Sequence, residues 1–339
     1  MRRILAIGGF LAAWATLLAV AAPARSETVS MAMDWVLNGK HSPFFVGIDK
    51  GFYREAGLDV KISRGHGSAT TAKDVGAKAV DYGFSDSPSV IIVRARGAQV
   101  KLLAVIHDKA PHVLFSLAGT GIKTPADLKG KKIGATAGDA IRAFFPAFAR
   151  ANGLDPEKDY TWVTITAAAK APSLLSGRVD AVTNFVTDAP PMIAKAAELG
   201  KKINTLRFTD WGVDLYSNGL ATQEKRIQEN PDQVRRVVAA VMKSWAWAVE
   251  HPGETIQLYQ KYVPAISPSL ARQQLDIAID LLLSENAGRS GIGHIDRDKM
   301  KRTIDLIAKY MGDQLPSRPS LEEVYTNEFL PKLFPKRGK

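Results

Sequence analysis

Three short loops of the sequence combine residue types that bind small polar molecules. The first carries Trp35, Asn38 and His41, the second Ser85-Asp86 and the third Gly138-Asp139. An indole ring offers a flat face for stacking, whereas amide and imidazole groups form directional hydrogen bonds. The N-terminus of a following helix attracts a negative or polar group. These groups favour noncovalent capture of a small solute.

Several of these residues also have a purely structural interpretation. Trp35 is the kind of residue that more often lies in a core, and Asp86 and Asp139 are typical helix caps. Gly67 and Ser68 belong to the Gly-rich turn Gly65-His66-Gly67-Ser68, which offers backbone N–H groups to a ligand or serves as a plain turn. Both interpretations stay open at this point.

The common catalytic and metal-binding patterns are missing from the sequence. The chain contains no cysteine, which excludes thiol nucleophiles, disulfides and Cys-ligated metals. Its six histidines are scattered, and none has the His-x-x-x-His spacing of a helical metal site. It also contains no P-loop and no Gly-x-Ser-x-Gly motif. We therefore expect no catalytic residues, no metal and no cofactor.

Strand-like and helix-length segments alternate from residue 27 to about residue 222. The expected strands are residues 29–33, 58–62, 82–85, 100–106, 132–135, 161–165, 179–184 and 203–208. Such alternation indicates βαβ units and mainly parallel sheets. The three loops all follow expected strands, and α/β sheets bind ligands at the carboxyl ends of their strands.

A weak internal repeat divides this part of the chain. Ala56-Gly57-Leu58-Asp59 recurs as Asn152-Gly153-Leu154-Asp155, and Ala79-Val80-Asp81-Tyr82 recurs as Arg178-Val179-Asp180-Ala181, at offsets of 96 and 99 residues. In each copy a glycine ends a helix as a left-handed cap and a strand follows. The shared order predicts two similar α/β lobes; the alternative is a chance match of common dipeptides.

The chain beyond residue 222 is almost entirely helical in pattern. Apolar residues recur at spacings of three and four, which predicts one buried face; they are Val234, Val237, Val238, Val241, Trp245 and Val249. Further helices are expected at residues 253–262, 269–284 and 297–311. We expect this helical segment to brace a lobe.

The N-terminus has the layout of a secretory signal peptide. Arg2 and Arg3 precede an apolar run over residues 4–22, and cleavage is expected between Ala24 and Ser26. An uncleaved anchor is the alternative. Removal of three arginines leaves 42 basic against 34 acidic residues, which lowers the net charge from +11 to +8. The remaining basic residues are scattered and not interleaved with aromatics, so we expect no nucleic-acid partner.

One stretch resembles a known family. Residues 34–60 read DWVLNGKHSPFFVGIDKGFYREAGLDV. This resembles the periplasmic solute-binding proteins of ABC importers, in the group that binds thiamine-pyrimidine precursors, riboflavin, nitrate and alkanesulfonates. Val80-Asp81-Tyr82-Gly83 and residues 128–134 are similar to the wider group, whereas Leu37 replaces a frequent proline.

The resemblance implies a type II binding-protein fold of two doubly wound α/β lobes joined by two crossovers, near Val113 to Leu117 and near Tyr216 to Leu220. The signal peptide would be residues 1–26, lobe one residues 27–115 plus 217–339, and lobe two residues 116–216. The helical C-terminal segment would brace lobe one. A periplasmic monomer is expected, with an ABC permease and its ATPase as partners.

The resemblance also implies a ligand site in the cleft between the lobes. Its expected residues are Trp35, Asn38, His41, Gly67, Ser68, Ser85, Asp86, Gly138, Asp139, Asn184 and Asp188. The expected solute is heteroaromatic and pyrimidine-like; an aliphatic sulfonate, nitrate or an aromatic acid is the alternative. A pyrimidine synthase of the same fold is a remote alternative, because it would carry a Cys-rich motif and no export signal. A sensor that docks on a receptor kinase is a third.

Overall fold

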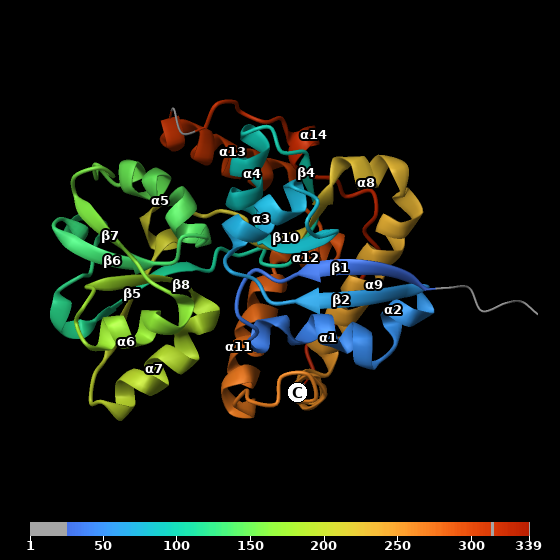
Figure 1. Ribbon diagram of the computed structural model, residues 1–339, viewed down its shortest axis with the longest axis horizontal. Coiled ribbons are helices and arrows are strands. Elements are labelled where there is room, and N and C mark those ends of the chain that lie inside the picture. The colour runs from blue at the N-terminus through green and yellow to red at the C-terminus, as the bar shows by residue number, and fades with distance from the viewer. Residues whose placement is uncertain (1–25, 313–314, 339) are drawn as a thin grey trace, which may run out of the picture.

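Two α/β lobes lie side by side, each built on a five-stranded sheet, in a computed structural model that describes residues 26–312 and 315–338 (Figure 1). The sheet of lobe one has the order β2-β1-β3-β10-β4 and that of lobe two β7-β6-β8-β5-β9. The strands of lobe one are β1 (Glu27–Ala32), β2 (Leu58–Ser63), β3 (Tyr82–Asp86), β4 (Val100–Val105) and β10 (Asn218–Gln223). Those of lobe two are β5 (His112–Leu117), β6 (Lys131–Ala135), β7 (Tyr160–Thr164), β8 (Ala181–Phe185) and β9 (Ile203–Arg207).

Both sheets are mainly parallel, as the alternation predicts. β10 runs antiparallel to β3 and β4, and β5 runs antiparallel to β8 and β9, while β1 and β6 pair in parallel with both of their neighbours. Four strands of each sheet therefore point the same way. Their carboxyl ends face the space between the lobes. The predicted fold class of two α/β lobes is confirmed.

Helices cover both faces of each sheet. Lobe one contains α1 (Ser42–Asp49), α2 (Phe52–Glu55), α3 (Ser68–Gly76) and α4 (Ser87–Ala95), and lobe two contains α5 (Ala140–Ala151), α6 (Lys170–Leu175) and α7 (Ala189–Glu198). The C-terminal part adds α8 (Glu224–Glu229), α9 (Pro231–Glu250), α10 (Pro252–Gln260), α11 (Pro268–Leu282), α12 (Glu285–Ser290), α13 (Arg297–Met311) and α14 (Leu321–Val324). The segment expected to be a signal peptide lies outside the described residues apart from Ser26. Among the described residues, no helix is long and apolar enough to cross a membrane.

The internal repeat has a physical basis in equivalent strands. Gly57 and Gly153 adopt left-handed φ angles of 70° and 72° on the way into β2 and β7, directly before the one and seven residues before the other, and these strands hold the same place in the two sheets. Asp81 accepts the backbone N–H of Ser30 in β1 at 2.8 Å, and Asp180 accepts that of Lys132 in β6 at 2.7 Å. Each aspartate thus ties the start of β3 or β8 to the neighbouring strand β1 or β6 of its lobe. The predicted duplication is confirmed.

The structure corrects the expected crossovers. Val113 to Leu117 belong to β5, which pairs with β8 and β9, and Asn218 to Leu220 belong to β10 of lobe one. The chain instead passes between the lobes at residues 106–111 and returns over residues 208–217. The expected boundary between residues 115 and 116 therefore falls inside a strand of lobe two. The sequence pattern did not predict β5 and β10, because both strands are antiparallel to their neighbours and neither follows a helix in a βαβ unit.

The C-terminal helices brace lobe one and also contact lobe two. α9 packs on α1 with the predicted stripe from Val234 to Val249, whose members are all buried. α11 contacts the turn Gly39–His41 of lobe one and α7 of lobe two. α13 packs on α4 and on α5. The helical segment therefore joins the two lobes as well as covering one of them.

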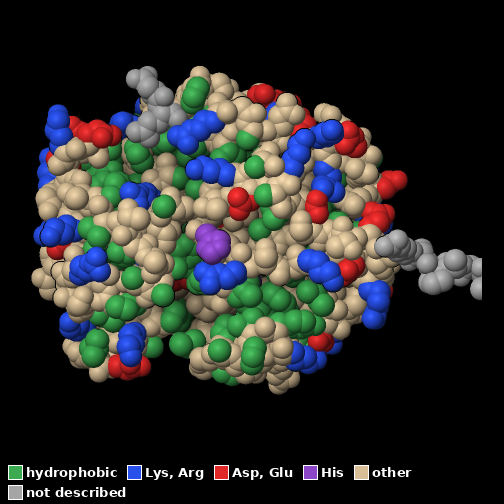
Figure 2. Space-filling model, in the orientation of Figure 1, with side chains coloured by type: hydrophobic (Ala, Val, Ile, Leu, Met, Phe, Trp, Pro, Cys, Tyr) green, Lys and Arg blue, Asp and Glu red, His purple; other side chains and the backbone are tan. Residues whose placement is uncertain are grey.

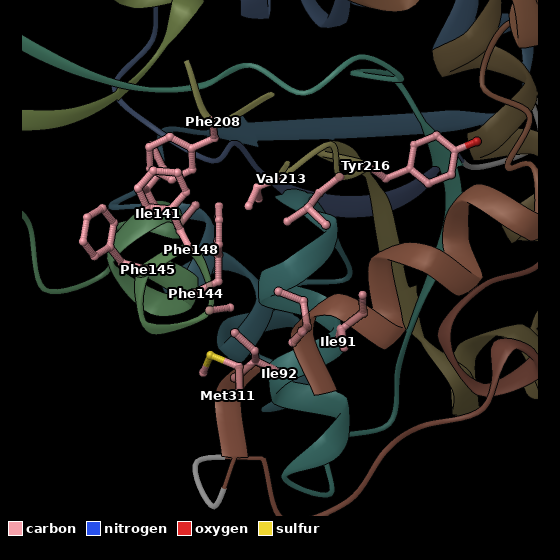
Figure 3. Packing of buried hydrophobic residues seen from close by; sticks show 14 of the residues in the cluster. Ile91, Ile92, Ile141, Phe144, Phe145, Phe148, Phe208, Val213, Tyr216 and Met311 are labelled. Carbon is pink, nitrogen blue, oxygen red and sulfur yellow. The ribbon is translucent and has the colours of Figure 1, made fainter. Parts of the chain in front are cut away.

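An apolar cluster crosses from one lobe to the other (Figure 3). Ile91 and Ile92 of α4 share this cluster with the phenylalanines of α5 and with Met311 of α13. Phe148 stacks on Phe208 with ring centroids 3.9 Å apart and planes 14° apart. On this side the lobes are packed like a single core, and we call this region the pivot.

A buried aspartate ties both crossovers to lobe one. Asp86, fully buried at the end of β3, accepts hydrogen bonds from His112 Nε2 at 2.9 Å and from Ser217 Oγ at 2.7 Å. His112 begins β5, and Ser217 ends the returning segment. One carboxylate thus holds the two connections together at the pivot. Its predicted helix-capping role is not observed, since no side-chain cap bond forms at α4.

Replacement of Asp86 should loosen this pivot. We expect Asp86→Ala to lower the free energy of unfolding by about 3 kcal/mol, because two buried donors lose their acceptor. The exposed Asp210 serves as a control, and Asp210→Ala should change it by less than about 0.5 kcal/mol. Urea denaturation measures both variants. Equal stability of the two would contradict the pivot assigned to Asp86.

Candidate ligand-binding site

A cavity lies between the lobes where the loops after β1, β2, β6 and β8 meet, and its empty volume is about 290 Å³, part of it open solvent. We call it the inner cavity; it is lined by Asp34, Trp35, Lys40, Gly67, Ser68, Asp139, Ala140, Ile141, Lys170, Asn184, Phe185 and Asp188. Six of the expected site residues are among them: Trp35, Gly67, Ser68, Asp139, Asn184 and Asp188. The strand-end loops of both lobes therefore build one site, as the parallel sheets predict.

Asn38 and His41 shape the first loop. The Asn38 side-chain oxygen accepts the N–H of Lys40 at 3.2 Å, and His41 Nδ1 accepts the N–H of Asn38 at 3.0 Å. Because Nδ1 accepts, Nε2 carries the proton and donates to Asp34 Oδ1 at 2.7 Å. His41 is fully buried, and burial lowers its pKa. Neither residue lines the inner cavity; together they fold the turn that delivers Lys40 to it.

Asp34 and Lys40 form a buried ion pair on lobe one. Lys40 Nζ lies 2.7 Å from Asp34 Oδ2, and both side chains are almost fully buried. Burial alone would raise the pKa of Asp34, but the Lys40 charge and the hydrogen bond from His41 hold it well below its usual range. The Lys40 ammonium also lies 4.8 Å from the Phe185 ring centroid of lobe two. The pair is ionised and reaches across the cleft.

Lobe two presents an equivalent pair at the end of β6. Lys170 Nζ lies 2.6 Å from Asp139 Oδ2 and donates to the Thr183 carbonyl oxygen, also at 2.6 Å. The other oxygen of Asp139 accepts the N–H of Ile141 at 2.9 Å, so the predicted capping of α5 is observed as well. Lys170 lies over the Trp35 ring of lobe one, 4.7 Å from its centroid. In each lobe, an aspartate thus neutralises the lysine of the same lobe. The lysine ammonium also lies over an aromatic ring of the opposite lobe.

Two polar groups of the inner cavity remain open to a ligand. Asp188 forms no ion pair with a described residue; one of its oxygens accepts from Asn38 Nδ2 at 3.2 Å across the cleft, and the other accepts the N–H of Phe185 at 3.3 Å. Burial raises the pKa of Asp188. The Asn184 Nδ2 atom is buried and has no hydrogen-bond partner among the described residues. The cavity therefore offers one carboxylate acceptor and one amide donor.

Three further expected site residues lie away from the inner cavity. Ser85 Oγ donates to the Ser68 carbonyl oxygen at 2.9 Å, and Asp86 holds the crossovers. Both are fully buried, and neither lines the cavity. Gly138 lies at the cleft surface instead, where it meets the turn of Gly67. Ser85 and Asp86 therefore belong to the end of β3, and Asp86 serves the pivot, which the sequence could not reveal because His112 and Ser217 are distant along the chain.

The glycines mark a place where the lobes touch. A Cβ atom on Gly67, whose φ is +120°, would lie 1.9 Å from the Gly138 carbonyl oxygen. A Cβ atom on Gly138 would lie 2.1 Å from Thr70 Oγ1. Only glycine lets the two backbones approach this closely, so the structure is that of closed lobes.

Lys40, Lys170 and Phe185 were missed by the sequence interpretation. All three line the inner cavity. Lys40 lies inside the stretch that carries the family resemblance, but a lysine between a glycine and a histidine looks like a solvated charge. Lys170 follows an Ala-rich stretch and had no signal at all. Their carboxylate partners Asp34 and Asp139, which lie beside the expected strand-end loops, were the only available clue.

Among the described residues, no group of three or more His, Asp or Glu side chains could hold a metal ion. The polar groups of the cavity are paired or aimed at its interior, which suits recognition of an organic solute.

Comparison with known proteins agrees with this architecture. A family described as "NMT1/THI5 like" matches residues 38–255. The chain belongs to this family. It is 24% identical to the riboflavin-binding protein RibY of Chloroflexus aurantiacus, over 90% of this chain and 86% of that protein. It is 25% identical to the formylaminopyrimidine-binding protein of Halalkalibacterium halodurans, over 82% of this chain and 84% of that protein.

The family also contains proteins named as enzymes. The chain is 24% identical to a 4-amino-5-hydroxymethyl-2-methylpyrimidine phosphate synthase of Saccharomyces cerevisiae, over 74% of this chain and 75% of the synthase. Among solved structures, the periplasmic aliphatic sulphonate-binding protein SsuA of Escherichia coli superimposes with a TM-score of 0.65 at 16% identity, over 92% of this chain and 94% of that protein. This likeness confirms the periplasmic binding-protein fold.

Closure should depend on the small size of residue 138. We expect Gly138→Ala to disfavour the closed lobes, because the added methyl group would meet Thr70 Oγ1 and the His66 carbonyl oxygen. The chain has no cysteine, so one engineered cysteine in each lobe can carry a spin label for distance measurement. The short-distance population should fall, with and without saturating solute.

Gly119→Ala is the matched control, because a Cβ atom there would meet nothing within 4 Å. An unchanged distance distribution in Gly138→Ala would show that the lobes close without this contact. The free energy of unfolding should change by less than about 0.5 kcal/mol in both variants, since neither residue lies in the core.

Proposed function

We propose that this chain is the solute-binding component of an ABC importer and captures a heteroaromatic, pyrimidine-like solute in the inner cavity. One observation carries the proposal: both lysines of the cavity are already paired with an aspartate, while the Asp188 carboxylate forms no ion pair with a described residue and the Asn184 amide nitrogen has no hydrogen-bond partner among them. An aminopyrimidine presents an N–H donor beside a ring-nitrogen acceptor. That pairing complements one carboxylate and one amide donor.

The charge of the cavity supports a neutral or cationic solute over an anion. Two lysines face three aspartates there, and each lysine is in contact with one of them. A sulfonate or nitrate ion would need an unpaired cation and would instead meet the Asp188 carboxylate. A sulfonate, a nitrate ion or an aromatic acid would therefore fit this cavity less well than it would fit a cavity with an unpaired lysine.

The aromatic walls support a flat solute. Trp35 of lobe one and Phe185 of lobe two both line the inner cavity, and each has a lysine ammonium over its ring. These cation–π contacts fix the rings before a ligand arrives. A planar ring between the lobes can then exclude water with little loss of side-chain freedom.

Export to the periplasm and delivery to a permease complete the proposal. The expected signal peptide, the binding-protein fold and the relatives named as binding proteins support this role. A synthase is a weaker candidate, because the chain lacks cysteine whereas the Cys-rich motif is expected of that enzyme. Basic side chains are scattered over the face in Figure 2 and form no stripe, in keeping with a small-molecule partner.

Isothermal titration calorimetry tests the ligand class. We expect binding of a 4-aminopyrimidine, and much weaker or no binding of riboflavin, benzoate, nitrate and an alkanesulfonate. The protein is first unfolded in denaturant and refolded, which removes any solute that was carried through purification. Tight binding of the sulfonate without binding of the aminopyrimidine would refute the proposed solute class.

Two substitutions test the assigned groups. Asp188→Asn should weaken aminopyrimidine binding by about 1.5–3 kcal/mol, because a charge-assisted hydrogen bond is lost. Trp35→Ala should weaken it by about 1–3 kcal/mol through the loss of an aromatic wall. Asp210→Asn is the control, since Asp210 is exposed and outside the cavity. An unchanged dissociation constant in either variant would exclude that side chain from the site.

A further inference from the structure

A second, larger hollow opens beside the inner cavity at the boundary between the lobes. It has an empty volume of about 1290 Å³, part of it open solvent, and we call it the vestibule. Residues from both lobes line it, including Trp35, Arg64, His66, Thr136, Thr166 and Arg178. Trp35 lines the inner cavity as well, so the two spaces are neighbours at this residue.

The vestibule differs from the inner cavity in charge. Arg64 of lobe one and Arg178 of lobe two are exposed, and neither forms a hydrogen bond or ion pair with a described residue. None of the described residues that line this hollow is acidic. The lysines of the inner cavity, in contrast, are each bound to an aspartate. Figure 2 shows a histidine and a basic side chain together at the surface near the boundary of the lobes.

One threonine hydroxyl of the vestibule is also without a partner among the described residues. The Thr136 Oγ1 atom is shielded from solvent and has no hydrogen-bond partner among the described residues. It lies in the loop after β6, close in sequence to the Gly138 contact that closes the lobes. A ligand there would therefore touch the segment that moves when the lobes close.

We propose that the vestibule is an anion-binding site, in which Arg64 and Arg178 hold a phosphate-like group between the lobes and so favour the closed arrangement. The inference extends the proposed function and rests on it for the opening and closing of the lobes. The two guanidinium groups line one hollow with no acidic residue among its described lining, so an anion between the lobes would supply the missing counter-charge. Guanidinium also matches the oxygens of phosphate with paired N–H donors.

Two sources can supply such an anion. A solute whose ring occupies the inner cavity can extend an anionic tail past Trp35, or free phosphate can bind independently of the solute. In both cases the chemistry is the same, and the anion contacts one arginine from each lobe. Because the effect depends on closure, anion and solute should strengthen each other's binding reciprocally.

Phosphate binding to the unliganded protein is the first test. Titration of inorganic phosphate at constant ionic strength, followed by the ³¹P line width, should show saturable binding to the wild-type chain. Arg64→Gln and Arg178→Gln should each weaken binding by about threefold to tenfold, a range set by exposed charge-assisted contacts. Arg302→Gln is the control, because Arg302 is exposed and does not line the vestibule. It should bind phosphate like the wild type.

The second test distinguishes the two sources of the anion. The affinity of an aminopyrimidine alcohol is compared with that of its phosphate ester, in chloride and in phosphate buffer. A tighter ester whose advantage disappears in the double variant Arg64→Gln/Arg178→Gln supports the tail. Tighter binding of the alcohol in phosphate buffer, lost in the same variant, supports the free anion.

The outcomes separate this inference from the proposed function. Failure of all pyrimidines to bind, with phosphate binding that depends on Arg64 and Arg178, would refute the solute class and leave the anion site intact. Phosphate and ester effects that are equal in the wild type and the double variant would overturn the anion site, even if the alcohol binds. Circular dichroism confirms that the exposed substitutions leave the fold unchanged.

Discussion

Ionised carboxylates buried at strand ends, each neutralised by a lysine of its own lobe, are the constraint on which the cleft depends. Transfer of a carboxylate from water to such a place costs several kcal/mol unless a partner charge and hydrogen bonds compensate. Asp34 has Lys40 and His41 for this purpose, and Asp139 has Lys170 and Thr183. The loop conformations that bring these partners together are therefore required for folding as well as for the shape of the cavity.

The same requirement explains the roles of Asn38 and His41. Both lie in the stretch most typical of the family. Both form hydrogen bonds within the turn that directs Lys40 toward Asp34. They act on a ligand through the position of another side chain. Asn38 has one further role, because its amide nitrogen reaches Asp188 on the opposite lobe. Cavity geometry and lobe closure are thereby linked in one short segment.

Much of the fold could be predicted from the sequence, because alternation, glycine caps and apolar spacing are local signals. Gly57 and Gly153 indicated the duplication. The apolar residues of α9 recur at spacings of three and four, which predicted its buried face. The crossovers were misplaced since β5 and β10 are defined by pairing with distant strands. Asp86 was assigned to the cleft because its partners, 26 and 131 residues away, leave no local trace.

The separate neutralisation of each lysine has an evolutionary consequence. A single exchange of Asp139 for asparagine would release the Lys170 charge into the cavity while Thr183 still holds the ammonium in place. Two lysines would then face two aspartates, and the cavity would offer an anion an ammonium group without an acidic partner, with no change of backbone. Selectivity for heteroaromatic or for anionic nutrients is thus one mutational step apart on this scaffold, which offers a physical route by which one fold could diversify across importers of unrelated nutrients.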